Sequence, residues 1–340
     1  MPKGNNVTMK DIAELLGVSV MTVSKVINGH TDISEKTRDR VLKKIDEMGY
    51  TPNIMATNLR SRRGKLVALV LSDVGQPYFG RVIAGCEHIL ESYGYVALAF
   101  NSMEDVLREE QALRHIDSMR MAGVIIDPVQ DSDPEQKVLR QLDIPYVFFN
   151  RFPMSGCDYS VAADNEEAGY LASAYLLESR PGRPVICVNG PARITPTVHR
   201  YEGYLRALGE AGRTLEPGSV FDNCFDLTDA YNTGREIAEQ FEPPFSIFCS
   251  TDQIAIGVLR ALRDSHLQVP RDVSVIGVDD IDIARYHVPA LSTVALPRRR
   301  IGEESAYMLI SLIEGKPIEE PHIFLKPDLV LRETTIKDND

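Results

Sequence analysis

The first fifty residues carry apolar positions that repeat with the period of an α-helix. Thr8 can cap a helix that begins at Met9, and Gly17 can end it, because glycine favours the left-handed conformation found after helices. The residues expected on the inner face of this helix are Ile12, Leu15 and Leu16. The pattern predicts a short amphipathic helix followed by a tight turn.

Two further helices follow the turn. Ser19 can cap the second helix and Ser34 the third. The residues expected to face inward are Val23, Val26 and Ile27 in the second helix and Val41, Leu42, Ile45 and Met48 in the third. This leaves on the outer face of the second helix Val20, Met21, Thr22, Ser24 and Lys25. Two short helices joined at a glycine and supported by a third form a helix-turn-helix unit.

From Leu66 onward, short apolar runs alternate with amphipathic helical segments. The predicted strands are 66–71, 95–100, 123–126, 146–149, 184–188, 246–249 and 274–278. The predicted helices between them include 78–92, 105–121, 166–177, 199–210, 230–241 and 253–264. Repeated strand–helix–strand units predict doubly wound parallel sheets with both faces covered. Because about 275 residues is large for one such sheet, we expect two lobes.

Polar residues follow several predicted strands, at the edge of a parallel sheet where ligands bind. They are Asp73, Asn101, Ser102, Asn150, Arg151, Asn189, Thr251, Asp252, Asp279 and Asp280. Carboxylates and amides can bind ligand hydroxyls, and arginine can donate a planar fork of hydrogen bonds. Each one alone is more typical of a helix cap, but together they favour a binding cleft.

The charge is divided unevenly along the chain. Residues 1–65 contain 12 Lys and Arg against 7 Asp and Glu, a net charge of +5. The other 275 residues contain 25 against 42, a net charge of −17. A basic helix-turn-helix head on an acidic body is typical of a DNA-binding arm attached to a sensor domain.

Several other classes of protein are disfavoured. No apolar run approaches the ~18 residues of a membrane helix, and the start lacks the apolar stretch of a secretory signal, so we expect a cytoplasmic protein. Nucleotide-binding glycine motifs and the nucleophile elbow are missing, and the seven histidines are dispersed. The five cysteines form no CxxC pair and are predicted to be free thiols. We therefore expect no enzyme, no cofactor and no metal.

The head resembles the lac repressor (LacI/GalR) family over about sixty residues. The matching stretches are Val7-Thr8-Met9-Lys10-Asp11-Ile12-Ala13, Gly17-Val18-Ser19, Thr22-Val23-Ser24-Lys25-Val26-Ile27-Asn28-Gly29 and Gly49-Tyr50-Thr51-Pro52-Asn53. The resemblance implies a DNA-binding domain at 1–52, a hinge helix and linker at 53–64, and a two-lobed effector-binding and dimerisation domain at 65–340, like periplasmic sugar-binding proteins. It places crossovers between the lobes near residues 162, 293 and 325.

The resemblance also implies the DNA contacts. The helix 19–28 would lie in the major groove, with Val20 and Met21 at base edges and Lys25 beside them. Ser19, Thr22, Ser24 and Asn28 would position the phosphate backbone, and Thr8 and Asn53 also belong to this surface. In the hinge, Leu59 would be a wedge in the minor groove, with Ala56 as the close-packed position before it.

The effector contacts implied by the resemblance extend the strand-end residues. The residues expected to line the effector site are Asp73, Tyr78, Phe79, Asn101, Asn150, Arg151, Asp164, Arg200, Phe225, Asp252 and Asp279. Ile194 and Pro196 lie where nucleobase-binding members have polar contacts, which favours a sugar or sugar phosphate over a nucleobase. Asn150 replaces a common aspartate, and this leaves the hydrogen bonding around Arg151 open.

The sequence thus predicts a sequence-specific transcriptional regulator, a repressor under allosteric control. It would be a homodimer on a pseudo-palindromic DNA operator, because the polar C-terminal tail shows no apolar heptad for a tetramer. The alternatives are a regulator that responds to a nucleobase or another metabolite, a sugar-binding receptor without DNA function, and a doubly wound enzyme. Whether the effector releases or tightens DNA binding is left open.

Overall fold

The computed structural model describes residues 7–27, 32–50, 64–129, 138–153 and 156–336. The chain divides into two units, residues 1–64 and residues 65–340. Within the described ranges, no helix is both long enough and apolar enough to cross a membrane.

The described residues of the first unit form a bundle of three helices, α1 (Met9–Leu16), α2 (Val20–Ile27) and α3 (Glu35–Glu47). The predicted caps form as hydrogen bonds: Thr8 and Asp11 make a reciprocal capping box, and Gly17 is left-handed with φ 64°. The backbone N–H of Thr22 donates to Ser19 Oγ at 3.0 Å. The core contains Ile12, Ala13, Val23, Val26 and Val41.

Two predicted inward residues of this bundle lie outside instead. The side chain of Leu15 is 64% exposed and that of Leu42 is 48% exposed. At 100° per residue, Ile12, Ala13 and Leu16 span one arc of α1, and Leu15 lies well to the side of its centre. In α3, Leu42 lies 100° around the helix axis from the buried Val41, and this turns its side chain towards solvent. Helical spacing of apolar residues was therefore not enough to predict which of them are buried, because the buried face of these helices is narrow.

The second unit contains two α/β lobes, as the alternating pattern predicts. The sheet of lobe 1 has the order β11-β5-β4-β3-β1-β2 and all its strands are parallel. The strands are β1 (Leu66–Leu71), β2 (Val96–Asn101), β3 (Gly123–Ile126), β4 (Tyr146–Phe149), β5 (Ser160–Ala163) and β11 (His322–Leu325). The helices given by the described residues of this lobe are α5 (Phe79–Ser92), α6 (Val106–Ser118) and α13 (Arg298–Ile313). All six residues of β1 are buried, because α5 and α13 cover one face of the sheet and α6 packs on the other.

Lobe 2 has a second sheet of the order β12-β10-β9-β8-β6-β7, parallel except for β12. The strands are β6 (Val185–Val188), β7 (Val220–Phe221), β8 (Phe245–Cys249), β9 (Val273–Asp279), β10 (Ser292–Ala295) and β12 (Asp328–Val330). The helices are α8 (Asn165–Ser179), α9 (Thr195–Glu210), α10 (Leu227–Gln240), α11 (Asp252–Asp264) and α12 (Asp282–Tyr286). The doubly wound fold predicted from the sequence is confirmed in both lobes.

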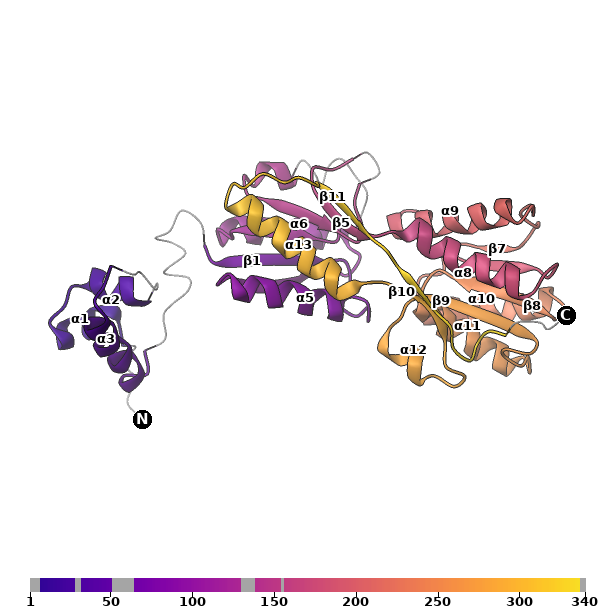
Figure 1. Cartoon of the computed structure of the whole chain (residues 1–340), viewed down its shortest axis with the longest axis horizontal. Helices are drawn as coiled ribbons and strands as arrows, with labels where there is room; N and C mark the ends of the chain where they lie inside the picture. Colours follow the sequence, from indigo (N-terminus) through magenta and orange to yellow (C-terminus); the bar gives the residue numbers. More distant parts are fainter. Residues whose placement is uncertain (1–6, 28–31, 51–63, 130–137, 154–155, 337–340) are drawn as a thin grey trace. The chain divides into compact units, whose positions relative to one another are not determined.

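The chain passes between the two sheets three times: from β5 to β6, from β10 to β11, and from β11 to β12. Figure 1 shows the consequence: α13, coloured for the end of the chain, packs beside α5, which comes from the start of lobe 1. Two glycines allow this close packing. A Cβ on Gly85 would overlap the backbone of Arg299, and one on Gly302 would overlap the backbone of Val82. The three connections place a cleft where the two lobes meet.

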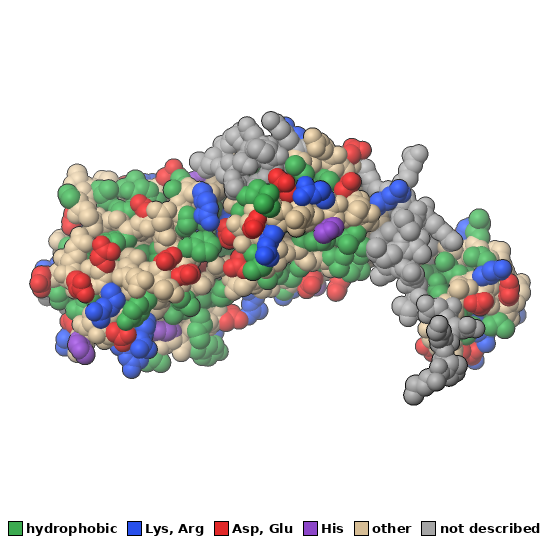
Figure 2. Space-filling view, turned by 180° about the vertical axis from the view of Figure 1, so that it is seen from behind, with side chains coloured by type: hydrophobic (Ala, Val, Ile, Leu, Met, Phe, Trp, Pro, Cys, Tyr) green, Lys and Arg blue, Asp and Glu red, His purple; other side chains and the backbone are tan. Residues whose placement is uncertain are grey.

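The surface of residues 65–340 carries the acidic charge. Figure 2 shows carboxylate side chains spread over the face that it presents. The thiols of Cys86, Cys187, Cys224 and Cys249 are buried and that of Cys157 is half-buried, and no disulfide joins any of the five within the described residues.

Candidate functional site

The outer face of α2 is the candidate DNA surface. Val20 is 38% exposed and Met21 is 70% exposed, so both apolar side chains are accessible to a partner. Thr22, Ser24 and Lys25 are half-buried, and the Lys25 ammonium pairs with Asp32. The Thr8 hydroxyl lies 2.7 Å from Asp11 Oδ2 within the capping box. The remaining predicted DNA contacts lie outside the described residues: Asn28, Asn53, Ala56 and Leu59.

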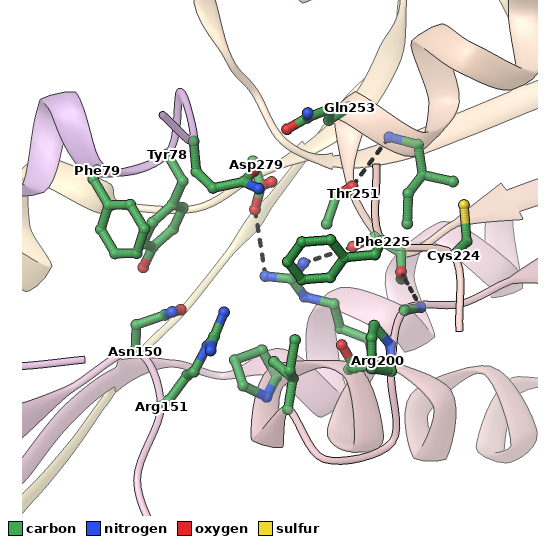
Figure 3. A pocket seen from close by; sticks show the side chains of 18 residues that line it. Tyr78, Phe79, Asn150, Arg151, Arg200, Cys224, Phe225, Thr251, Gln253 and Asp279 are labelled. Carbon is green, nitrogen blue, oxygen red and sulfur yellow. Dashed lines mark hydrogen bonds and ion pairs between the residues drawn. The ribbon is translucent and has the colours of Figure 1, made fainter. Parts of the chain in front are cut away.

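A cavity in the second unit lies at the carboxyl ends of the strands, between lobe 1 and lobe 2. It encloses about 670 Å³ of space, part of which is open to solvent. Seven predicted effector residues line it: Tyr78, Phe79, Asn150, Arg151, Arg200, Phe225 and Asp279. Figure 3 shows Tyr78, Phe79, Asn150 and Arg151 of lobe 1 on one side of the space and Phe225 and Arg200 of lobe 2 on the other.

Arg200 is the central charged residue of the lobe 2 wall and is only 4% exposed. Its Nε donates to Asn165 Oδ1 at 2.8 Å, and one terminal nitrogen donates to the Ser250 carbonyl oxygen at 2.6 Å. The other terminal nitrogen lies 3.3 Å from Asp279 Oδ1. These three acceptors come from α8, from the residue that follows β8, and from β9, so the guanidinium is held rigidly at the cavity wall.

Asp279 ends β9 in a strained conformation. Its φ is 117° and that of Asp280 is 51°, values that L residues adopt rarely and that occur at binding sites. Burial raises the pKa of Asp279, although the guanidinium groups of Arg200 and Arg298 oppose this rise. Arg298, the first residue of α13, donates to the carbonyl oxygens of Asp280 at 2.6 Å and Pro77 at 3.4 Å. Arg298 thereby links the strained turn of lobe 2 to the loop that precedes Tyr78.

The lobe 1 wall is built around a carboxylate that we did not predict, Asp127 after β3. It is fully buried and accepts hydrogen bonds from the Ser72 hydroxyl and, at 2.8 Å, from Asn150 Nδ2. Asn150, which is left-handed with φ 57°, therefore donates where an aspartate could not. This settles the bonding that the sequence left open.

Arg151, also on this wall, makes its main ion pair with Glu104. The two are joined by hydrogen bonds of 2.6 and 3.1 Å. A second guanidinium, that of Arg193 from lobe 2, lies 3.5 Å from the same carboxylate and 5.7 Å from the Phe225 ring centroid. Glu104 and Arg193 escaped prediction because neither follows a strand directly or belongs to a matched motif.

Four predicted effector residues lie off the cavity wall. Asp73 accepts from the N–H of Gly75, and Asp164 caps α8. Asn101 accepts from the N–H groups of Val74 and Met103. These three satisfy local backbone groups, which is the commoner role of a polar residue after a strand.

Asp252, the fourth, is completely buried at the start of α11. Its Oδ1 accepts from the Thr293 hydroxyl at 2.5 Å, and its Oδ2 accepts from the N–H of Ile281 at 2.9 Å. Thr293 belongs to β10, which leads into the second connection between the lobes. The structure thus places Asp252 behind the cavity as a support for the turn at Asp279, while its neighbours Thr251 and Gln253 line the wall.

Comparison with known proteins matches both units. Residues 8–53 match the model described as bacterial regulatory proteins, lacI family, and residues 173–335 match the periplasmic binding protein-like domain. The HTH-type transcriptional repressor PurR of Vibrio atlanticus (strain LGP32) is 31% identical, over 96% of this chain and 98% of its own. The HTH-type transcriptional regulator RegA of Clostridium saccharobutylicum is 30% identical, over 97% of this chain and 99% of its own.

Solved structures agree with this comparison. A complex of the transcriptional regulator CelR with cellobiose has a TM-score of 0.74 at 29% identity and covers 96% of this chain and 99% of its own. The lac repressor dimer bound to operator and the anti-inducer ONPF has a TM-score of 0.85 at 24% identity, over 98% and 100% of the two chains. The chain therefore belongs to the lacI family of bacterial regulatory proteins and is a DNA-binding transcriptional regulator with an effector-binding domain.

Proposed function

We propose that this protein is a homodimeric repressor whose affinity for a pseudo-palindromic operator is set by a sugar or sugar phosphate bound between its lobes. Residues 1–52 bind the major groove, residues 53–64 form the hinge, and residues 65–340 sense the effector and dimerise. Two heads related by a twofold axis match two operator half-sites. The role on DNA makes it a cytoplasmic regulator rather than an enzyme.

The observation that carries this proposal is the convergence of both lobes on one cavity. Tyr78, Phe79 and Asn150 reach it from lobe 1, and Arg200 and Phe225 reach it from lobe 2. Aromatic rings next to a few fixed polar groups suit a sugar, which has apolar faces and hydroxyl edges. Ile194 and Pro196 add apolar wall and lack the side-chain hydrogen-bonding groups that would select a nucleobase edge.

The route from cavity to DNA runs through contacts between the lobes. Thr195 Oγ1 donates to the Phe152 carbonyl oxygen at 2.9 Å, and Arg81 lies 3.2 Å from Asp282. A ligand that contacts both lobes favours one arrangement of these contacts over another. The arrangement of lobe 1, which continues into the hinge, then sets the affinity for the operator. Effector and operator must change each other's affinity by the same factor.

The test starts from DNA selected out of a random pool by the full-length protein, because the operator sequence has to be found first. Binding of the selected duplex is followed by fluorescence anisotropy, with and without candidate sugars, sugar phosphates and nucleobases. We expect a palindromic consensus and one compound class that shifts the operator affinity. No sequence enrichment would contradict the regulator, and a shift by nucleobases alone would contradict the sugar.

Arg200→Ala tests the cavity, with Arg260→Ala as the control. Arg260 is an exposed arginine of α11 paired with Asp264 at 3.0 Å, so both variants lose one guanidinium. We expect Arg200→Ala to remove the effector response and to leave binding to the selected operator close to that of the parent. An unchanged effector response in a folded Arg200→Ala protein would remove Arg200 from the site.

A further inference from the structure

The cavity wall divides its polar groups into two kinds. The charged groups pair with one another, and Arg151 Nε, which makes no hydrogen bond among the described residues, lies 3.7 Å from Asp127 Oδ2. Two uncharged groups, the phenol of Tyr78 and the amide of Gln253, have a buried oxygen without a partner among the described residues. Tyr78 precedes α5 in lobe 1, and Gln253 lies in the first turn of α11 in lobe 2. What remains for a ligand to satisfy is therefore neutral hydrogen-bonding capacity on both sides of the cleft.

The guanidinium groups around the cavity each have a carboxylate. Arg200 has Asp279 at 3.3 Å. Arg151 has Glu104 at 2.6 Å and Asp127 at 3.7 Å. Arg193 at the rim shares Glu104 at 3.5 Å. Three cations thus face three carboxylates within the structure itself.

Replacing one of these carboxylates by a ligand anion would be costly. The side chains of Arg151 and Glu104 are each 11% exposed, and Asp127 is 0% exposed. An incoming phosphate would compete with Glu104 for both Arg151 and Arg193, and a displaced carboxylate would stay buried without a partner. Arg298 offers no substitute, since it does not line the cavity and donates to backbone carbonyl oxygens.

We propose that the effector is uncharged: a hydroxyl-bearing molecule such as a neutral sugar, which hydrogen-bonds to Tyr78 Oη and the Gln253 amide and carries no phosphate or carboxylate. This inference rests on the proposed function, in which the cavity is the effector site, and it narrows the sugar-or-sugar-phosphate class proposed there. Gln253 becomes a specificity-determining residue. Its neighbour Ile254 also lines the wall, so the start of α11 contributes an amide and an apolar surface side by side.

Inorganic phosphate is the direct probe. It is titrated into the full-length protein at neutral pH against chloride of equal ionic strength, and the melting temperature is recorded. We expect no saturable rise in the parent. Glu104→Gln removes the carboxylate that Arg151 and Arg193 share and should produce a saturable rise. The control, Glu110→Gln, removes a carboxylate paired with Arg114 on the surface of α6 and should behave as the parent.

Matched pairs then test the effector itself: glucose with glucose 6-phosphate, and ribose with ribose 5-phosphate. Any pair that shifts operator affinity should act through its neutral member, and Gln253→Leu should reduce that shift at least tenfold. A saturable phosphate effect in the parent, a stronger effect of a phosphorylated member, or no gain in folded Glu104→Gln would each overturn the uncharged effector. If Glu104→Gln does not fold, the parent titration decides alone. These outcomes leave operator binding untouched, whereas failure to select any DNA sequence would count against the proposed function.

Discussion

Gly169 of α8 lies directly against the backbone carbonyl oxygen of Arg200 in α9. A Cβ on Gly169 would come closer to that oxygen than real Cβ atoms ever do, and the neighbouring Arg200 Cα would also be too close. The converse holds at Gly203, where a Cβ would overlap the carbonyl oxygen of Glu166 in α8. The two glycines set the depth at which α9 packs, and therefore where the Arg200 guanidinium meets the cavity.

Gly169→Ala should push α9 away from α8. We expect a loss of about 1–3 kcal/mol in the free energy of unfolding, as for other overpacked cores, together with a weaker effector response. Gly209→Ala is the control, because Gly209 lies on the partner helix α9 and a Cβ there meets nothing within 4 Å. That variant should gain up to about 1 kcal/mol from helix propensity. Denaturant unfolding measures the stability of each variant, and effector titration measures its effector response. Equal stability of the two variants would refute the packing argument.

Met21→Ala should change which DNA sequence is preferred without destabilising the head. The side chain is 70% exposed on α2, so its removal costs little packing. Loss of an apolar contact to a base edge should alter discrimination at one position of each half-site by about 1–3 kcal/mol. Sequence selection with the parent, Met21→Ala and Leu42→Ala measures this, since Leu42 is also exposed but lies on α3. An unchanged consensus in Met21→Ala would exclude Met21 from base recognition.

Local spacing in the sequence predicted the fold and the strand-end residues of the cavity wall, whereas Tyr78, Phe79, Arg200 and Phe225 were predicted from the family resemblance. The strand Leu66–Leu71 has a continuous apolar run, and Asn150 and Asp279 stand at strand ends, where topology brings them together. Glu104 and Arg193 could not be predicted in this way, because their ion pair forms only when two lobes meet. Asp252 shows the reverse error: a motif residue beside the wall has a side chain directed into the core.

Leu59→Ala should weaken operator binding at least about tenfold, or about 1.4 kcal/mol, and leave effector binding intact. This prediction follows from the family resemblance, in which the hinge leucine is a wedge between base pairs. Leu107→Ala is the control, because Leu107 is a leucine 67% exposed on α6 in the effector-binding unit. Anisotropy with the selected operator measures the difference. A Leu59→Ala protein that binds the operator as tightly as the parent would argue against the hinge assignment.

Asp252→Asn should change the pH dependence of stability in a definite direction. Burial raises the pKa of Asp252 well above 3.8, and the nearby Asp279 carboxylate adds to this rise. Between the ordinary pKa and the raised one, the folded protein holds a proton that the unfolded chain has lost. The contribution of Asp252 to stability is therefore greatest below the ordinary pKa and declines as the pH rises through the window.

The asparagine variant lacks this titration. Its amide offers one acceptor oxygen in place of two, so either the Thr293 hydroxyl or the Ile281 N–H loses its acceptor, and the cost of that loss does not depend on pH. The difference in melting temperature between the parent and the variant should therefore become smaller as the pH rises from 4 towards neutrality, because only the parent loses stability through this titration. Asp264→Asn, at a half-buried carboxylate whose pKa is lowered by hydrogen bonding to Arg260, should show the opposite trend below the ordinary pKa, because the stabilisation by Asp264 is lost as the pH falls through that range. Parallel pH profiles for the parent and Asp252→Asn would mean that Asp252 does not change its protonation state within this window.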